Sequence, residues 1–317
     1  MACQYLAALS ISIVPNFISI SINVVFRPFL GMKVSMKYPV SSPLISVYMA
    51  TRNRADLLKR AVDSVFSQDY GNFELVVVDD GSNDDTPAVL AAYQSKYDNF
   101  RYYCNKDSLG VAAARNRAIE ECRGAFVTGL DDDDYFKSNR LSSLMAVYDD
   151  KYAFVCSSVI WDFGDRRKIA DSKKKVFNLS QQLSYNHATT QVLVSRERIL
   201  AIDGFDDNLV ARLDYDLWTR LMIRHGSALR INQPSYVLNR QADVKRLTAG
   251  ERNITGNHQF VAKYRARMSP KNLLNQAFRD IYAQQMPFGL KALIGQLWGG
   301  HMTLKIKYFI RINFLRR

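Results

Sequence analysis

The stretch Gly124-Ala-Phe-Val-Thr-Gly-Leu-Asp-Asp-Asp-Asp134 joins an apolar run to four consecutive aspartates. The run Gly124–Leu130 is typical of a short buried strand, which places Asp131–Asp134 in the loop at its carboxyl end. Neighbouring carboxylates repel one another, and no basic residue occurs after them until Lys137. A divalent cation would relieve this repulsion, and Mg²⁺ and Mn²⁺ prefer carboxylate oxygens. The pattern therefore indicates a metal site.

In an extended stretch alternate side chains share a face, so Asp131 and Asp133 can act together. The same aspartates also have a second interpretation. The alternative is a solvated acidic turn, in which Asp134 or Ser138 caps a helix that starts near Asn139. The stretch by itself leaves both open.

Strand-like and helix-like segments alternate along the chain from residue 44. Apolar runs predict strands at Leu44–Ala50, Phe73–Val78, Arg101–Cys104 and Gly124–Leu130, and amphipathic or Ala-rich stretches predict helices at Arg54–Gln68, Thr86–Tyr97 and Gly110–Cys122. This alternation predicts an α/β fold, with a largely parallel sheet covered by helices on both faces. Ligands bind at the carboxyl ends of such strands. Three polar clusters fall there: Thr51-Arg52-Asn53-Arg54, Asp79-Asp80-Gly81-Ser82 and Asp131–Asp134.

Composition and missing motifs exclude several classes of protein. A chain of 317 residues with 48% hydrophobic residues can bury a large core. No GxGxxG comes after the first strand and no Walker lysine loop occurs, which argues against dinucleotide and P-loop sites. The four cysteines form no CxxC or Cys/His cluster, which favours a reducing compartment.

Basic residues concentrate near the C-terminus. Ser269–Arg317 holds eight Lys and Arg and one acid, Asp280, and so carries +7 of the net +13. Trp298, Tyr308, Phe309 and Phe314 are interleaved with bases that include Lys305, Lys307 and Arg311. This mixture favours a segment attracted to an anionic membrane surface, and no nucleic-acid-binding motif accompanies it. The alternative is an ordinary basic helical surface. A second basic stretch, Asp165–Lys175, is expected to be a loop that is either solvated or in contact with a diphosphate.

The first 26 residues contain no charged side chain. Ala7–Phe26 is long enough to span a bilayer, and the basic residues Arg27, Lys33 and Lys37 would hold the rest of the chain in the cytoplasm. The alternative is that translation begins at Met32 or Met36. We therefore divide the chain into an apolar segment (1–37), a catalytic domain (38–247) and a basic helical region (248–317).

Six short motifs occur in order between about Leu44 and His225: Ser46-Val47 with Thr51-Arg52-Asn53-Arg54, Ser64–Tyr70, Phe73–Ser82, Gly110–Asn116, Leu130–Asp134 and Asp214–Trp218. In this order and spacing the chain resembles the family 2 glycosyltransferases. The resemblance implies the nucleotide-sugar-binding fold called GT-A, a Rossmann-like, mixed and mostly parallel sheet, here joined to the basic helical region.

The resemblance also implies roles for single residues. Thr51, Arg52 and Arg54 would belong to the nucleotide-sugar site, and Asp80 would accept a hydrogen bond from the pyrimidine edge. Arg115 would assist the phosphates.

The resemblance implies roles for the acidic residues in metal binding, ribose binding and catalysis. Asp131 to Asp133 would form the DXD motif, with Asp133 and Asp131 as metal ligands and Asp132 or Asp131 near the ribose. Asp214 would be the general base of an inverting transfer. Its alternative is a helix N-cap.

Three departures from the family pattern concern details. Leu213 precedes Asp214 where relatives often carry Glu, and Arg52 replaces an aromatic that stacks on the base. No histidine appears in Asn239-Arg240-Gln241, and His258 lies too far downstream. His187 belongs to the acceptor-side region, as a structural or a substrate-binding residue.

These observations predict an enzyme that transfers a hexose from a UDP-hexose with Mn²⁺ or Mg²⁺. The predicted acceptor is a polyprenol-diphosphate-linked sugar, and the specific prediction is a β-1,3 linkage to GlcNAc-diphosphate-undecaprenol in O-antigen synthesis. The predicted location is the cytoplasmic face of the bacterial inner membrane. Two alternatives are a phosphatase with an aspartate nucleophile and a non-enzymatic module that binds membranes or polyanions.

Overall fold

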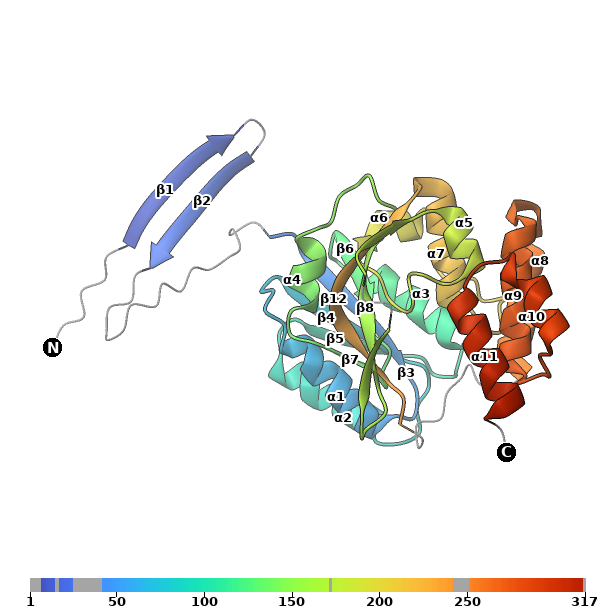
Figure 1. Ribbon diagram of the computed structural model, residues 1–317. Coiled ribbons are helices and arrows are strands. Elements are labelled where there is room, and N and C mark those ends of the chain that lie inside the picture. The colour runs from blue at the N-terminus through green and yellow to red at the C-terminus, as the bar shows by residue number, and fades with distance from the viewer. Residues whose placement is uncertain (1–6, 15–16, 25–41, 171–172, 242–250, 316–317) are drawn as a thin grey trace. The chain divides into compact units, whose positions relative to one another are not determined.

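The computed structural model describes residues 7–14, 17–24, 42–170, 173–241 and 251–315 (Figure 1). They belong to two units, one that ends at Leu44 and one that begins at Ile45. In the first, β1 (Ala7–Val14) and β2 (Phe17–Val24) pair antiparallel. The segment predicted as a possible membrane span thus contains these two strands in its described residues, in keeping with the strand preference of Ile and Val. Within the described ranges, no helix has the length and apolar character needed to cross a bilayer. Several residues used in the sequence analysis lie outside the described residues. They are the basic residues Arg27, Lys33 and Lys37, the alternative starting methionines Met32 and Met36, and the terminal Arg316 and Arg317.

A five-stranded sheet in the order β11-β6-β3-β4-β5 forms the centre of the second unit. Four of its strands are parallel: β3 (Ile45–Thr51), β4 (Phe73–Asp79), β5 (Phe100–Cys104) and β6 (Phe126–Gly129). The short β11 (Val194–Ser195) is antiparallel to β6. The predicted mostly parallel sheet is confirmed, and the predicted strands match within about two residues.

Helices cover both faces of this sheet, because alternate residues of β3 point in opposite directions. Val47 and Met49 share one buried cluster with residues of α1 (Ala55–Phe66) and α2 (Thr86–Lys96). Tyr48 belongs to the opposite cluster, with residues of α3 (Val111–Glu121) and α7 (Leu213–His225). The expected helices on both faces are thus present.

A second sheet is built around β12 (Ala228–Asn239) and β8 (Val155–Asp162), which are parallel. The strands β9 (Arg167–Ala170) on β8, and β10 (Lys175–Phe177) and β7 (Tyr135–Phe136) on β12, all pair antiparallel. The expectation that Asp165–Lys175 is a loop was therefore wrong in part, because Arg167–Ala170 pairs with β8 in a hairpin.

Short helices connect these sheets: α4 (Arg140–Met145), α5 (Leu179–Ser184) and α6 (Arg196–Leu200). Helix α4 starts where the sequence predicts, but Asn139 occupies its N-cap position and makes no side-chain capping bond. Neither Asp134 nor Ser138 caps it, so that alternative was wrong.

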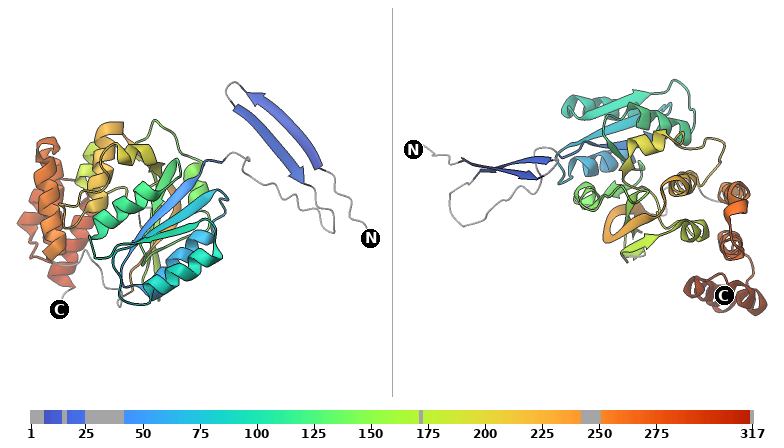
Figure 2. Two further views of the ribbon diagram at one scale, coloured as in Figure 1. Left: turned by 180° about the vertical axis from the view of Figure 1, so that it is seen from behind. Right: turned by 90° about the horizontal axis from the view of Figure 1, so that it is seen from above.

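The C-terminal helices α8 (Glu251–Tyr264), α9 (Pro270–Ala283), α10 (Leu290–Leu297) and α11 (Met302–Phe314) lie together at one end of this unit (Figure 2). Helices α8 and α9 hold α7 in place. Tyr264 Oη donates to the fully buried carboxylate of Asp216 at 2.6 Å, and Lys263 Nζ lies 2.7 Å from the same oxygen. Gln276 Nε2 donates to Tyr215 Oη at 2.9 Å, and the Tyr215 ring stacks on Phe260 with centroids 4.0 Å apart. The start of α7 is thereby fixed against the C-terminal region.

Candidate active site

The three predicted polar clusters meet at the carboxyl edge of the parallel sheet. Thr51 ends β3 opposite Asp79 of β4, and the Asp80 N–H donates to the Thr51 carbonyl oxygen at 2.9 Å. The Leu130 N–H, just before the aspartates, donates to the Tyr48 carbonyl oxygen at 3.0 Å. The strand register therefore brings together residues that are far apart in the sequence.

A buried arginine joins this edge to α7. Arg115 Nη2 lies 2.5 Å from Asp131 Oδ1, and its Nη1 lies 3.1 Å from Asp214 Oδ1. The guanidinium also sits over the Phe205 ring, 5.3 Å from its centroid. Burial opposes the charge on Arg115, but the two carboxylates raise its pKa above the ordinary value. Asp131 and Asp214, which are distant in the sequence, are thus held on one cation.

Burial also disfavours the charged form of Asp214. It raises the pKa of this carboxyl to about 7, because Arg115 offsets only part of the desolvation and Asp131 adds repulsion. A carboxylate whose pKa is raised toward neutrality is better suited to accept a proton than an ordinary surface aspartate. The N-cap residue of α7 is Arg212, so the alternative role of Asp214 as a helix cap was wrong.

Gln191 and Tyr48 support the same pair of aspartates. Tyr48 Oη donates to Gln191 Oε1 at 2.8 Å, and Gln191 Nε2 lies 3.4 Å from Asp131 Oδ1 and 3.5 Å from Asp214 Oδ1. Gly129 leaves room for this arrangement, since a Cβ there would collide with Gln191 Oε1. Sequence reasoning missed both residues as site components. Neither an uncharged tyrosine within a strand nor a glutamine carries a signal of this role.

The remaining acidic residues are more buried than a solvated turn would allow. Arg54 Nη1 lies 2.9 Å from Asp133 Oδ2 and 3.4 Å from Asp132 Oδ1. Burial raises the pKa of Asp132 to about 7, against the opposing effect of Arg54. Asp134 is 2% exposed, its Oδ1 accepts from the Asn239 N–H at 2.8 Å, and burial and its acidic neighbours raise its pKa well above the usual range. The interpretation as a solvated turn was therefore wrong.

The Asp80 carboxylate already accepts four hydrogen bonds from within the protein. Its Oδ1 accepts from Asn105 Nδ2 and the Leu109 N–H, and its Oδ2 accepts from Ser108 Oγ and the Gly110 N–H, at 2.7 to 2.9 Å. Burial alone would raise the pKa of Asp80, but these four bonds hold it below the ordinary value. Arg52 Nη1 reaches the same loop, donating to Ser108 Oγ at 2.9 Å.

The acidic loop suits a divalent cation that is shared with a substrate. Among the residues that the structure describes, no group of three or more His, Cys, Asp or Glu is arranged to hold a metal by itself. Mg²⁺ is usually bound by one or two carboxylates together with substrate phosphates, and a two-carboxylate site of this kind requires no larger cluster. Burial is the main cause of the raised pKa values of Asp132 and Asp134, and the neighbouring carboxylates add to it, so a cation placed here would favour the charged forms. The donor set thus fits the predicted metal, with Asp131 and Asp133 as its expected ligands.

His258 and His187 make contacts with other parts of the fold. His258, on α8, is paired with Asp280 at 3.1 Å, and His187 is buried with its ring 5.5 Å from that of Phe177. In the stretch where the resemblance led us to look for a histidine, the backbone N–H of Asn239 donates to Asp134.

Comparison with known proteins identifies the domain. Residues 46–203 match the model of glycosyl transferase family 2. The chain belongs to this family. The two alternatives, a phosphatase and a module without enzymatic activity, are thereby set aside, because the family model describes sugar-transferring enzymes.

Curated relatives of this glycosyltransferase are bacterial. It is 28% identical over 250 residues to a putative colanic acid biosynthesis glycosyl transferase, WcaA of Escherichia coli, covering 75% of this chain and 87% of the relative. A second relative is the GalNAc(5)-diNAcBac-PP-undecaprenol beta-1,3-glucosyltransferase of Campylobacter jejuni. It is 39% identical over 114 residues, which cover 36% of this chain and 37% of that protein.

Solved structures confirm the GT-A-like fold. TarS of S. aureus, residues 1–349 in complex with UDP-GlcNAc, matches with a TM-score of 0.63 at 20% identity, covering 84% of this chain and 81% of that one. The mannosyltransferase PcManGT of Pyrobaculum calidifontis, in complex with GDP-Man and Mn²⁺, matches with a TM-score of 0.50 at 17% identity, covering 88% and 89%.

The position of Gln191 gives a testable prediction. Gln191→Glu keeps the bond accepted from Tyr48 but turns a carboxylate oxygen toward Asp131 and Asp214 in place of the amide. We expect turnover to fall by about 10- to 100-fold, the scale of a buried polar group that faces like charges. Steady-state kinetics of the purified protein measure the loss.

Gln284→Glu is the matched control, because Gln284 is exposed and the charge change is identical. Normal turnover of Gln191→Glu at an unchanged melting temperature would show that Gln191 does not support the site.

Proposed function

We propose that this glycosyltransferase moves a hexose, glucose or galactose, from a UDP-sugar to a sugar linked through diphosphate to a lipid, with inversion at the anomeric carbon. The specific proposal is a β-1,3 linkage to GlcNAc-diphosphate-undecaprenol in bacterial surface polysaccharide synthesis. The names of the two relatives support this, one being assigned to colanic acid synthesis and the other to a lipid-diphosphate-linked acceptor. The TarS complex with UDP-GlcNAc supports a UDP-sugar donor.

The observation that carries the proposal is the pair of contacts from Arg115 to Asp131 and Asp214. An inverting transfer needs a base on the acceptor side and a charged site for the departing diphosphate, and the two must lie close together. Arg115 holds the proposed base next to the acidic loop. Asp214 then takes the proton of the acceptor hydroxyl as its oxygen bonds to the anomeric carbon and UDP leaves with the electron pair.

The donor would lie along the carboxyl edge of the sheet. Thr51, Arg52, Arg54 and Asp80 line this edge at the ends of β3 and β4. Asp131 and Asp133 would hold Mn²⁺ or Mg²⁺, which when bound neutralises charge on the leaving diphosphate. The Mn²⁺ in the PcManGT structure supports this choice of ion.

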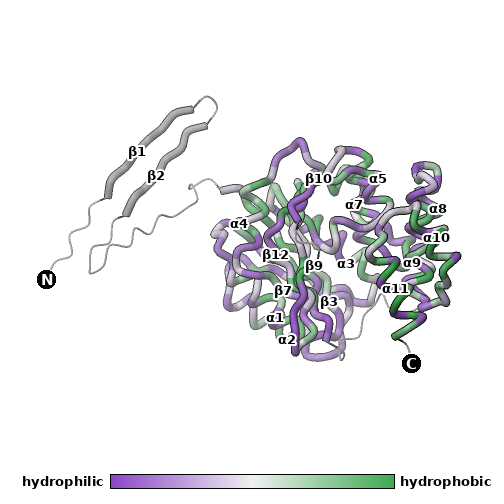
Figure 3. Tube along the Cα trace, viewed as in Figure 1, coloured by the Kyte–Doolittle hydropathy of each residue, from purple (hydrophilic) through white to green (hydrophobic). Residues whose placement is uncertain are grey.

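The last two helices support a location at a membrane surface. Large apolar side chains are exposed at intervals of four residues, at Leu290, Ile294 and Trp298 around α10 and at Met302, Ile306, Ile310 and Phe314 along α11. Trp298 is 77% exposed and Phe314 68%. Both helices are rich in hydrophobic residues along the trace (Figure 3). We name this set the apolar stripe. The exposed bases Lys291, Lys307 and Arg311 accompany it, as anionic lipid would require.

Two residues assigned to this surface from the sequence face inward. Lys305 is buried, and its Nζ donates to Asn275 Oδ1 at 3.0 Å and to the Gln296 carbonyl oxygen at 2.7 Å. Tyr308 is 1% exposed among Phe278 and Phe288. They join the C-terminal helices to one another, so the expectation that they face lipid was wrong.

The proposed base is tested by two substitutions two residues apart. Asp214→Asn should leave UDP-sugar binding intact and lower turnover by about 10²–10⁴-fold, the usual range for general-base catalysis. Asp216→Asn should instead lower the melting temperature, because Asp216 is buried against Arg220, Lys263 and Tyr264. Transfer assays, calorimetric donor binding and thermal melts distinguish the two. Loss of UDP-sugar binding in Asp214→Asn, with normal turnover of the fraction bound, would assign Asp214 to donor binding.

The proposed metal is tested by its removal. EDTA should abolish transfer from the UDP-sugar and Mn²⁺ should restore it. Asp133→Ala should lower turnover by at least about 10²-fold, the scale of a main electrostatic stabiliser. Asp207→Ala, an exposed aspartate outside the site, is the control. Full transfer in EDTA by a protein shown to be metal-free would contradict the metal role.

The proposed membrane contact is tested with anionic vesicles. Replacing Ile294, Trp298 and Ile310 by Ser should weaken sedimentation with phosphatidylglycerol vesicles by at least about 10-fold, since burying each such side chain contributes about 1.5–3 kcal/mol. Turnover on a short soluble acceptor should stay normal. The control replaces the exposed Val176 and Leu200 by Ser. An equal effect in the control, or a parallel loss on the soluble acceptor, would contradict a specific lipid contact.

A further inference from the structure

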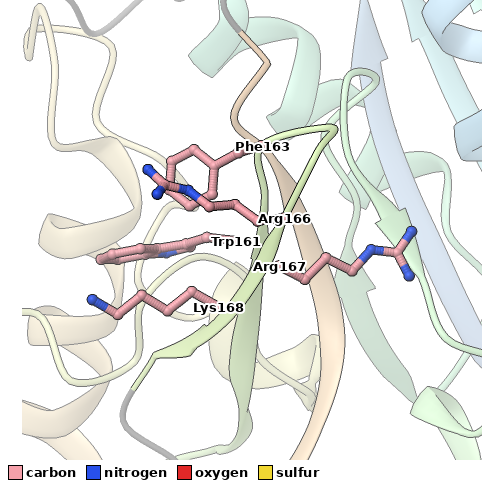
Figure 4. Close-up of a pocket in the computed structure, with 5 residues that line it drawn as sticks. All are labelled: Trp161, Phe163, Arg166, Arg167 and Lys168. Carbon is pink, nitrogen blue, oxygen red and sulfur yellow. The ribbon is translucent and has the colours of Figure 1, made fainter.

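The hairpin of β8 and β9 carries a hollow that the proposed chemistry does not use. Its volume is about 390 Å³, and it is lined by Trp161, Phe163, Arg166, Arg167 and Lys168 (Figure 4). Small-ligand sites are commonly about 300–1,000 Å³. The combination of two aromatic and three basic residues separates this hollow from an ordinary loop surface.

The aromatic rings hold the cations in place. Trp161 and Phe163 meet edge to face, with centroids 6.5 Å apart. The Arg166 guanidinium lies 5.2 Å from the Phe163 ring centroid, and Lys168 Nζ and Arg240 Cζ each lie 5.7 Å from that of Trp161. Cations in such positions are attracted by the ring faces. The positive charges of Arg166 and Lys168 in the hairpin, and of Arg240 just after β12, are therefore gathered around one pair of rings.

Among the described residues, these three charges have no carboxylate partner. Figure 4 shows Arg166 and Lys168 on the side of the hairpin that carries the two rings, and Arg167 on the other side. Arg167 is paired with Asp162 at 3.1 Å. Within the part of the chain that the structure describes, no carboxylate lies within 4.0 Å of the charged nitrogens of Arg166, Lys168 or Arg240. Arg166 and Lys168 thus bring to the hollow two cations without a described carboxylate partner, and Arg240 adds a third beside Trp161.

Hydrogen bonds connect the hairpin to the acidic loop. Tyr135, directly after the four aspartates, donates from Oη to Asp162 Oδ2 at 2.5 Å and accepts from Arg167 Nη2 at 3.0 Å. On the neighbouring strand, Asn239 lies opposite Asp162 and its N–H binds Asp134. The hollow is therefore anchored to the same loop that contains the proposed metal ligands.

We propose that this hollow binds the diphosphate of the acceptor, so that Arg166 and Lys168 in the hollow, with Arg240 beside it near Trp161, hold the lipid-linked sugar while its hydroxyl is presented to Asp214. The inference rests on the proposed function and names the part of the acceptor that is recognised. A diphosphate offers several anionic oxygens, to which guanidinium and ammonium groups donate charge-assisted hydrogen bonds. The donor diphosphate is assigned to the acidic loop, where carboxylates are available for a metal. The hollow has cations in place of carboxylates, which suits an anion bound without a metal.

The experiment compares two acceptors that carry the same sugar. In one the sugar is joined through diphosphate to a short prenol, and in the other it is joined directly to an alkyl chain. In the double variant Arg166→Ala/Lys168→Ala, we expect KM for the diphosphate acceptor to rise by about 10-fold or more. KM for the alkyl glycoside, KM for the UDP-sugar and kcat should stay unchanged. The control is Lys173→Ala/Lys174→Ala, which removes the same charge from the same basic stretch outside the hollow.

Direct binding of inorganic pyrophosphate separates this inference from the proposed function. Calorimetry in EDTA should detect pyrophosphate binding to the wild type and the control, and its loss in the Arg166/Lys168 variant. This result would support the hollow even if no UDP-sugar were transferred. Unchanged pyrophosphate binding in the Arg166/Lys168 variant, an equal rise in KM for both acceptors, or an equal effect of the Lys173/Lys174 control would each overturn the inference.

Discussion

The buried guanidinium of Arg115 is the interaction on which the site depends. It belongs to α3, it contacts the loop after β6 through Asp131, and it contacts the start of α7 through Asp214. Without it, two carboxylates would face one another in a region where burial already disfavours their charge. Tyr48 on β3 and Gln191 in the segment before β11 complete this arrangement, and Gly129 provides the space for it. The geometry of the site is therefore a property of several elements of the fold together.

The beginning of α7 shows how neighbouring identical residues acquire different roles. Asp214 is paired with Arg115, and its pKa is raised to about 7. Asp216, two positions later, is fully buried between Arg220, Lys263 and Tyr264. The C-terminal helices thus fix the orientation of α7, even though they contribute no proposed catalytic group. This explains in physical terms why a transferase domain would keep a helical extension packed on it.

Much of the fold could be predicted from the sequence, because hydrophobic periodicity reports directly on burial. Strands β3 to β6 and helices α1 to α3, together with the polar clusters at the strand ends, follow from such patterns. Side-chain partners did not follow. The sequence of α11 could not reveal that Lys305 and Tyr308 face inward, since apolar residues occur on both the buried and the exposed side of that helix. The contacts of Gln191 depend on a strand 143 positions away from it in sequence, that of Tyr48, and no local pattern reports such a contact. The basic stretch after β8 looked like a loop because charged residues hide the strand pairing of β9.

The four hydrogen bonds on Asp80 bear on how the enzyme would distinguish one nucleotide from another. A carboxylate with unused lone pairs could accept new hydrogen bonds from a matching base. Here a base that approached Asp80 would have to replace a donor from the loop 105–110, so the number of bonds would stay nearly constant. Such an exchange yields little free energy of its own. Discrimination among bases would then come from the shape of the loop that Asp80 holds, and the selectivity of the donor site could be altered by changing that loop while Asp80 itself is kept.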